Sequence, residues 1–283
     1  MELIFTNRKN RVWLTSLIIV LLVAFLIVEL FPLFWMAEIS FKQYSDVIAT
    51  PPKFIFDPTL ENYAKAVSEK RTPFFHYFLN SAIVGVCSTA IALLVGVPAA
   101  YGFVRCRFRG KRNLKFWVLT TRMAPPIAVL IPYFIVFNQL RLIDSYLTII
   151  LMHITINLAL VVWMAISFLE EVPVELEEAA IIDGCSRLGS FLRVTFPLMA
   201  PGLAAISILA LVFSWNDLLF ALVLTGRKTA TAPVLITSFI TYQDVAWGKL
   251  TAASMLIMLP VVLFAFSVQK YILRGLTLGA VKG

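Results

Sequence analysis

The feature that most constrains this chain is a series of apolar stretches, each long enough to cross a lipid bilayer as one helix. A hydrocarbon core of about 30 Å needs roughly 20 apolar residues per helix. Six stretches meet that requirement, at approximately residues 12–37, 80–104, 114–138, 146–169, 202–224 and 250–272. The sequence therefore predicts an all-α integral membrane protein, a single transmembrane domain over residues 1–283 with six transmembrane helices.

Composition argues against a soluble or a nucleic-acid-binding protein. Hydrophobic residues make up 60% of the 283 residues and charged residues only 14%, which is far from the composition of soluble domains. The net charge of +8 does not indicate nucleic acid, because the basic residues are dispersed among the apolar stretches. The three cysteines fit no metal-ligand spacing, so we expect them to be reduced and expect no metal and no cofactor.

The distribution of Lys and Arg predicts which side each connection occupies, because cytoplasmic connections carry an excess of these residues. The connection after the second stretch contains six basic residues and no acid: Arg105, Arg107, Arg109, Lys111, Arg112 and Lys115. We expect it to be cytoplasmic, with both termini on the same side and residues 38–75 outside. The first stretch follows basic residues as a signal peptide would, but it is too long for one and should remain as an anchor.

The most polar interior segment, residues 170–201, reads EEVPVELEEAAIIDGCSRLGSFLRVTFPLMAP. Pro173 and the acidic residues after it are typical of the first turn of a helix, and Gly184 is typical of its end. Ser186 is a candidate N-cap of a second helix, which Pro197 should end. The pattern predicts a helix, a glycine bend and a helix. Its shape alone is equally that of an interfacial loop.

The spacing of residues in this hairpin resembles the EAA loop of ABC importer permeases. That pattern, E-A-A, three residues, G, nine residues, apolar, any, apolar, P, is filled by Glu178, Ala179, Ala180, Gly184, Val194, Phe196 and Pro197. In the family, the loop docks in a cleft of a cytoplasmic ATPase and receives the push of its ATP-driven closure. The resemblance assigns ATPase coupling to Glu178, Ala179, Ala180, Asp183, Gly184 and Pro197.

Other segments resemble the maltose-type, carbohydrate branch of the family. They are residues 51–67, 76–81, 121–126, 215–225 and 274–283. The resemblance implies a sugar or polyol substrate, a bacterial inner membrane, a second permease subunit, two ATPase subunits and a periplasmic or lipid-anchored solute-binding protein. Residues 226–247 by themselves indicate only a surface turn, but the resemblance implies that they reach toward the binding protein. Residues 51–67 are either a linker or a further contact with that protein.

Polar residues in the fifth stretch are candidates for contact with the solute. Trp215, Asn216 and Asp217 lie together there, and an aromatic face, an amide and a carboxylate suit a sugar. An equally good interpretation is a polar lock between helices.

Four more polar residues lie in or near the apolar stretches, where ionisable groups are costly enough to need a partner or water. His153 and Asn157 are one helical turn apart, and a hydrogen bond between packed helices is favoured over a position facing the pore. For Glu29 and Arg122 we favour an ion pair or a side chain that reaches the interface over contact with the solute. Proline kinks are expected at Pro32, Pro98, Pro125, Pro126, Pro132 and Pro260.

Together these features predict a permease subunit that is not itself an enzyme. The chain has no G-x-x-x-x-G-K-[ST] phosphate loop, so ATP is expected to bind to a partner subunit. An ion-driven secondary transporter that acts without an ATPase is the alternative, with the intramembrane acids as ion sites. A membrane-embedded enzyme is disfavoured, because no nucleophile and base are paired and the only histidines are His76 and His153.

Overall fold

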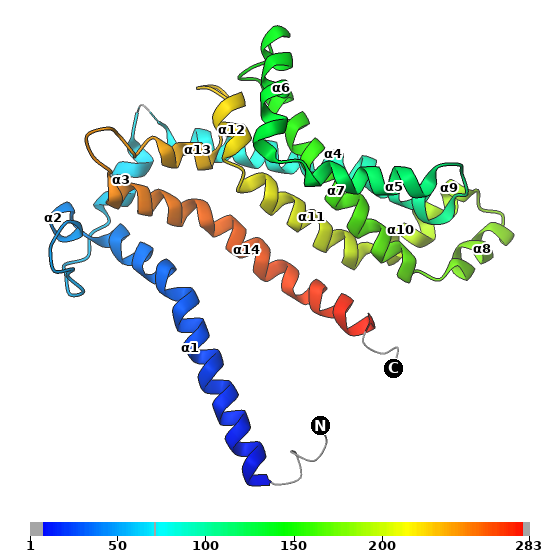
Figure 1. The fold of residues 1–283 in the computed structure, drawn as a ribbon, viewed down its shortest axis with the longest axis horizontal. Coiled ribbons are helices and arrows are strands. Elements are labelled where there is room, and N and C mark those ends of the chain that lie inside the picture. The colour runs from blue at the N-terminus through cyan, green and yellow to red at the C-terminus, as the bar shows by residue number, and fades with distance from the viewer. Residues whose placement is uncertain (1–7, 71, 280–283) are drawn as a thin grey trace. The chain divides into compact units, whose positions relative to one another are not determined.

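The computed structural model describes residues 8–70 and 72–279, with side chains from residue 13 to residue 267 except at 71. Every regular element in these residues is a helix, which confirms the all-α prediction. They form two compact units, which Figure 1 draws without fixing their relative positions. The first comprises Met1–Glu69 and Phe239–Leu256, and the second Lys70–Ser238 and Ile257–Gly283. Part of the predicted C-terminal motif at 274–283 lies outside the described residues.

The first unit is organised around the end of a long apolar helix, α1 (Arg8–Phe41), which continues through a short α2 (Tyr44–Val47). The side chain of Asn62, in α3 (Glu61–Ser68), donates hydrogen bonds to the carbonyls of Ser40 and Lys42, at 3.0 and 2.7 Å. This contact holds α3 against the end of α1. The unit also contains the start of α14 (Trp247–Gly279), which continues into the second unit.

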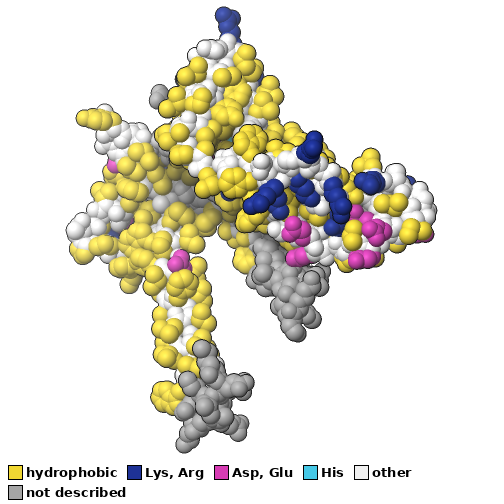
Figure 2. Space-filling view, turned by 45° about the vertical axis from the view of Figure 1, so that its right-hand side comes forward, with side chains coloured by type: hydrophobic (Ala, Val, Ile, Leu, Met, Phe, Trp, Pro, Cys, Tyr) yellow, Lys and Arg dark blue, Asp and Glu magenta, His cyan; other side chains and the backbone are white. Residues whose placement is uncertain are grey.

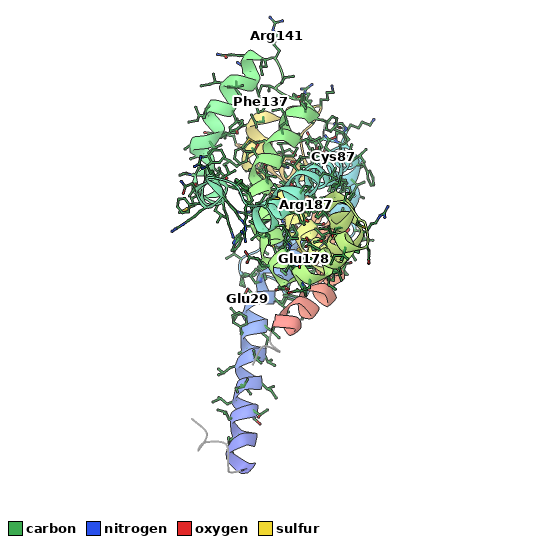
Figure 3. All side chains as sticks on the ribbon, turned by 90° about the vertical axis from the view of Figure 1, so that its right-hand side faces the viewer. Glu29, Cys87, Phe137, Arg141, Glu178 and Arg187 are labelled. Atoms are coloured by element: carbon green, nitrogen blue, oxygen red, sulfur yellow. The ribbon has the colours of Figure 1, made fainter. Side chains whose placement is uncertain are left out.

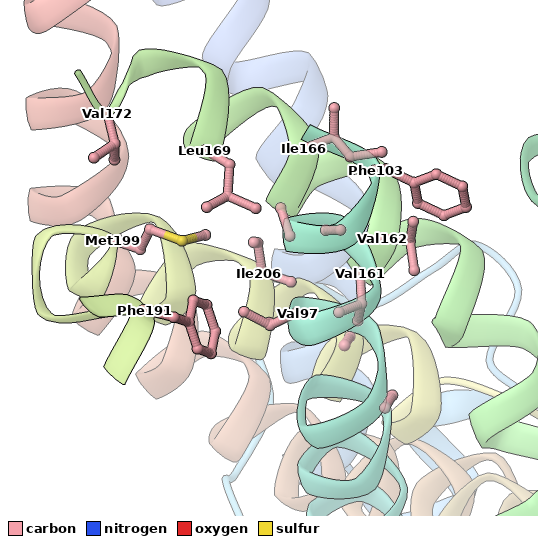
Figure 4. Packing of buried hydrophobic residues seen from close by; sticks show 14 residues of the cluster. Val97, Phe103, Val161, Val162, Ile166, Leu169, Val172, Phe191, Met199 and Ile206 are labelled. Atoms are coloured by element: carbon pink, nitrogen blue, oxygen red, sulfur yellow. The ribbon is translucent and has the colours of Figure 1, made fainter. Parts of the chain in front are cut away.

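The second unit is built on three helices that pack side by side: α4 (Phe74–Arg105), α7 (Tyr146–Glu171) and α11 (Ala200–Trp215) (Figure 1). Their shared core is a cluster of buried aliphatic and aromatic side chains, shown in Figure 4. Glycine allows the close approach of the helices. A Cβ on Gly96 would lie 2.7 Å from Val161, and one on Gly202 would lie 2.5 Å from the ring of Phe168.

Four helices in the described residues are long and apolar enough to cross a membrane, and the number rises to six if each of two bent pairs is one span. The four helices are α1, α4, α7 and α14, which coincide with the first, second, fourth and sixth predicted stretches. The first bent pair contains the third predicted stretch. The second pair, Arg187–Leu198 with Ala200–Trp215, overlaps only the first part of the fifth stretch, and its bend lies before that stretch begins.

The third predicted stretch is broken by consecutive prolines. The segment formed by α5 (Lys111–Thr120) and the 3-10 turn η2 (Thr121–Met123) makes an angle of 93° with α6 (Pro126–Gln139). Ala124 and Pro125 are extended, with ψ angles of 131° and 126°. A residue before proline avoids the helical region, and here two such residues follow each other. The sequence predicted kinks at Pro125 and Pro126 but not a right-angled corner.

The fifth predicted stretch, 202–224, is likewise not one helix. Helix α11 ends at Trp215, and α12 (Leu219–Leu224) begins after a break of three residues. In the break, the Asp217 carboxylate accepts a hydrogen bond from the backbone N–H of Ala221 at 3.1 Å. Aspartate side chains compete for backbone N–H groups in this way and favour the start of a new helix over continuation of the old one.

Residues 226–247 by themselves indicated only a surface turn, but the structure packs the first part of this segment, residues 226–238, into the second unit. This part includes α13 (Ala232–Thr237) and the buried residues Thr229 and Ala230. The Asn80 side chain donates to the carbonyls of Lys228 and Ala230, at 3.1 and 2.8 Å. A polar loop can be buried in this way only because side chains from neighbouring helices satisfy its backbone groups.

Candidate functional site

The first arm of the polar hairpin is α8 (Val174–Ile182), preceded by Pro173. Two hydrogen bonds close its end, from the N–H of Gly184 to the carbonyl of Ile181 and from the N–H of Cys185 to the carbonyl of Ala180. This pairing is the Schellman motif, which requires a left-handed residue at the bend. Gly184 supplies it with a φ of +93°, so the glycine bend predicted from the sequence is present.

The second arm begins as predicted, because the Ser186 side chain accepts a hydrogen bond from the N–H of Gly189 at 3.1 Å. It continues through α9 (Arg187–Ser190), the π-helical turn η3 (Phe191–Thr195) and α10 (Phe196–Leu198). The arm ends at Leu198, one residue after Pro197, so the predicted end is confirmed to within one residue. The arm bends by 76° into α11.

Most motif residues of the hairpin face outward. Glu178, Ala179, Asp183 and Gly184 are exposed, and Ala180 is half-buried. Figure 3 labels Glu178 and Arg187, one from each arm. The neighbouring apolar side chain of Ile182 is 85% exposed. This combination of small, acidic and apolar groups suits a protein partner better than water.

One acidic residue of the hairpin is buried, and it is not the one that the motif singles out. Glu177 is 4% exposed and is the only buried residue of α8. Its Oε1 accepts a hydrogen bond from Nε of Arg105 at 2.8 Å, and its Oε2 accepts one from the hydroxyl of Tyr101 at 2.9 Å. These contacts could not be predicted from the residue pattern, because Tyr101 and Arg105 lie more than 70 positions before Glu177 in the chain.

Arg105 also binds the end of α7. Its Nη2 donates to the carbonyls of Leu169 and Val172, at 3.3 and 2.7 Å. The other basic residues of the same connection include Arg107, Arg109 and Arg112, which are exposed. Figure 2 shows Lys and Arg side chains gathered on this unit with Asp and Glu side chains beside them. Arg105 thus joins α8 to the end of α7.

A second candidate site is a pocket of about 290 Å³ inside the second unit. It is lined mainly by apolar side chains, together with His153, Asn157, Asn216 and Asp217. His153 is buried, and its Nε2 lies 3.2 Å from Oδ2 of Asp217. Asn157 donates to the Ser214 hydroxyl at 2.7 Å and to the carbonyl of Ala210, the hydrogen bond between packed helices that the sequence favoured.

The polar residues predicted for the fifth stretch separate in the structure. Asn216 and Asp217 line the pocket, but Trp215 is buried, with its indole N–H donating to the carbonyl of Ile257 at 3.1 Å. The guanidinium of Arg122 lies over the ring of Phe213, 4.7 Å from the ring centroid, which is a cation–π contact. Glu29 is exposed on α1.

The chain matches a known protein family over the segment that contains both candidate sites. The family described as "Binding-protein-dependent transport system inner membrane component" matches residues 92–278, which is more than half of the chain and includes the hairpin and the pocket. The chain belongs to this family. It is therefore an integral, multi-pass permease of the inner membrane, and the ion-driven alternative has no support.

Two curated relatives extend the match over nearly the whole permease. The diacetylchitobiose uptake system permease protein DasC of Streptomyces coelicolor is 32% identical over 97% of this chain and 98% of its own length. The trehalose/maltose transport system permease protein MalG of Thermococcus litoralis is 32% identical over 97% of this chain and 99% of its own. Both names describe permease proteins of uptake or transport systems, and a permease is the role predicted from the sequence.

The fold also matches a solved structure. A chain from a bacterial ABC transporter involved in the import of the acidic polysaccharide alginate aligns with a TM-score of 0.77. The alignment covers 94% of this permease and 99% of that chain, with 24% sequence identity. This likeness shows that the two chains share an architecture.

Proposed function

We propose that this permease imports a sugar or polyol, with a second permease subunit beside it. Two ATPase subunits and a periplasmic or lipid-anchored solute-binding protein complete the assembly. The names of two relatives support the solute class, since one is a diacetylchitobiose permease and the other a trehalose/maltose permease. Because the chain has no phosphate loop, hydrolysis takes place on the partner ATPases.

The observation that carries the proposal is the exposed hairpin with its glycine bend. Glu178, Ala179 and Asp183 offer two charges and a small residue to a partner. The Schellman motif at Gly184 fixes the angle at which they are presented. In our proposal, the ATPase binds this surface, and ATP-driven closure moves the hairpin and the helices joined to it.

Reconstituted vesicles containing the binding protein, both permeases and the ATPase test this role. Gly184→Trp should lower solute uptake far more than ATP hydrolysis. Gly110→Trp is a matched control, because Gly110 also has a positive φ, of +80°, and a Cβ on either glycine would meet no atom within 4 Å. Backbone strain is therefore similar in both variants, and normal uptake by a well-expressed Gly184→Trp variant would remove the coupling role.

For the solute path, we propose Asn216 and Asp217 at the pocket. Their amide and carboxylate are the groups that hydrogen-bond sugar hydroxyls. The rival role is a lock between helices, which the bonds of Asp217 to His153 and Ala221 also favour. Asn216→Ala separates the two, because among the described residues the Asn216 side chain bonds only to the carbonyl of Val212 in α11, at 3.0 Å. A raised half-saturating solute concentration supports the path, and unchanged transport leaves only the lock.

We propose that both termini and the hairpin are cytoplasmic. The chain carries its own probes, since Cys106 lies in the basic connection and Cys185 in the hairpin, and both are partly exposed. In a background with Cys87 replaced, a membrane-impermeant maleimide should label both cysteines in inside-out vesicles and neither in intact cells with a permeable outer membrane. Labelling of Cys185 in those cells would place the hairpin outside.

A further inference from the structure

The hairpin is attached to the membrane helices in an unusual way. In α8 the apolar side chains of Leu176, Ile181 and Ile182 are exposed, and the single buried residue is the charged Glu177. A short helix on a protein surface normally buries its apolar face and exposes its charges. Hydrophobic burial therefore contributes little to holding α8, and its position depends on the hydrogen bonds that Glu177 makes.

Those hydrogen bonds meet at one place. Glu177 binds Arg105 and Tyr101 near the end of α4, while Arg105 also binds the last carbonyls of α7. The second arm joins the same cluster, because the Ser190 hydroxyl donates to the backbone carbonyl of Glu177 and the ring of Phe191 lies 4.6 Å from that of Tyr101. Two membrane helices and both arms of the hairpin thus share one polar joint.

We propose that the Arg105–Glu177 pair is the joint through which movement of the hairpin reaches α4 and α7. This role rests on the proposed coupling to an ATPase. It assigns binding of the ATPase and transmission of its movement to two adjacent residues. Glu178 faces outward to the partner, and Glu177 faces inward to the membrane helices. The pair is suited to transmission because an Arg–carboxylate contact in a water-poor site is directional and resists both tilting and separation.

Packed helices connect the Arg105–Glu177 pair to the pocket without interruption, so they can carry movement from one to the other. The cluster in Figure 4 packs α4 against α7 with glycine-mediated close contact at Gly96, so these helices move as one body. Along α7, Leu169 beside the joint and His153 at the pocket are 16 residues apart, about 24 Å of helix. A tilt imposed at Arg105 therefore displaces the pocket wall.

The test compares Glu177→Gln with Glu178→Gln in the reconstituted importer. Glu177→Gln keeps the shape but removes the charge, and should leave co-purification of the ATPase unchanged while lowering solute moved per ATP by roughly tenfold, the effect of weakening one charged hydrogen bond. Glu178→Gln should instead reduce ATPase co-purification. Arg107→Ala, at an exposed basic residue two positions from Arg105, should change neither quantity.

Two further variants keep the result decisive. If Glu177→Gln does not accumulate, Tyr101→Phe removes one hydrogen bond to Glu177 and keeps the ring contact with Phe191, and should lower solute moved per ATP by a smaller factor. Exchange of the pair, Arg105→Glu with Glu177→Arg, should recover part of what Arg105→Glu alone loses. Unchanged transport per ATP in Glu177→Gln or Tyr101→Phe overturns the joint. Failure of the wild-type chain to bind any ATPase overturns the proposed function instead.

Discussion

The carboxylate of Asp144 accepts a hydrogen bond from the backbone N–H of Gly226, with 2.8 Å between the nitrogen and Oδ1. Three more donors reach the same carboxylate, namely the N–H groups of Lys228 and Thr229 and the Thr229 hydroxyl. One side chain before α7 therefore holds the loop after α12 in place. This loop leads to α13, so its order depends on Asp144.

Asp144→Asn should loosen this loop without disturbing the turn that carries Asp144. Asp144 has a φ of +61°, which asparagine tolerates, but the amide nitrogen cannot accept the bonds that one carboxylate oxygen accepts. We expect a local loss of about 1–2 kcal/mol. Faster hydrogen exchange in residues 226–232 measures it, and Asp57→Asn, at an exposed site, is the control. Unchanged exchange would mean that the hydrogen bonds of His76, Asn80 and Ser81 to this segment order the loop without Asp144.

The same site predicts a dependence on pH. Burial raises the pKa of Asp144, but hydrogen bonds from Thr229, Gly226 and Lys228 outweigh this and hold the pKa below its ordinary value of 3.8. The loop is therefore fully stabilised above pH 3.8 and loses stability as the pH falls through the lower pKa of the folded protein. Hydrogen exchange in residues 226–232 should accelerate in that acid range in the wild type. Asp144→Asn should show no such step.

Gly202→Ala should destabilise the second unit, because its Cβ would lie 2.5 Å from the ring of Phe168. Overpacking of this kind costs about 1–3 kcal/mol. Gly102→Ala is the matched control within α4, since a Cβ there meets nothing within 4 Å and should stabilise the helix by about 0.5–1 kcal/mol. Thermal denaturation in detergent measures both. Equal stabilities would show that Phe168 moves aside at no cost.

Lys42→Met should destabilise the first unit strongly. Lys42 and Glu38 form an ion pair at 2.6 Å, with side chains only 2% and 6% exposed, so removal of one partner leaves an uncompensated buried charge. Such a loss costs about 3–5 kcal/mol. The double variant Glu38→Gln with Lys42→Met should recover much of it, because neither remaining side chain is charged. A double variant as unstable as the single one would contradict this account.

The sequence predicted those parts of the permease that depend on neighbouring residues. Gly184 and Ser186 act within one helical turn of their own positions, so the bend and the second N-cap were found from the residue pattern. Long apolar runs have few other uses, so the residue pattern also predicted the four helices that are long and apolar enough to cross a membrane. Asn157 was correctly expected to bond to a packed helix.

What the sequence missed depends on residues that are distant along the chain. The motif pointed to Glu178, but the burial of its neighbour Glu177 requires Arg105, which only the packing of α8 against α4 brings near. Trp215 looked like a sugar-binding residue because its indole suits one, and its neighbour Phe78 and the carbonyl of Ile257 place it in the core instead. Apolar periodicity could not show that the third stretch bends or that the fifth is interrupted after Trp215, since it does not report backbone angles.

The corner at Ala124 and Pro125 makes the stability of the permease depend on the thickness of the surrounding bilayer. Helix α6 has 14 residues and is about 21 Å long, which is shorter than a hydrocarbon layer of about 30 Å. Longer acyl chains would draw the irregular backbone at the corner into hydrocarbon, where water is absent. Bilayers that thin beside this corner avoid that cost, so short-chain lipids should favour the assembled transporter.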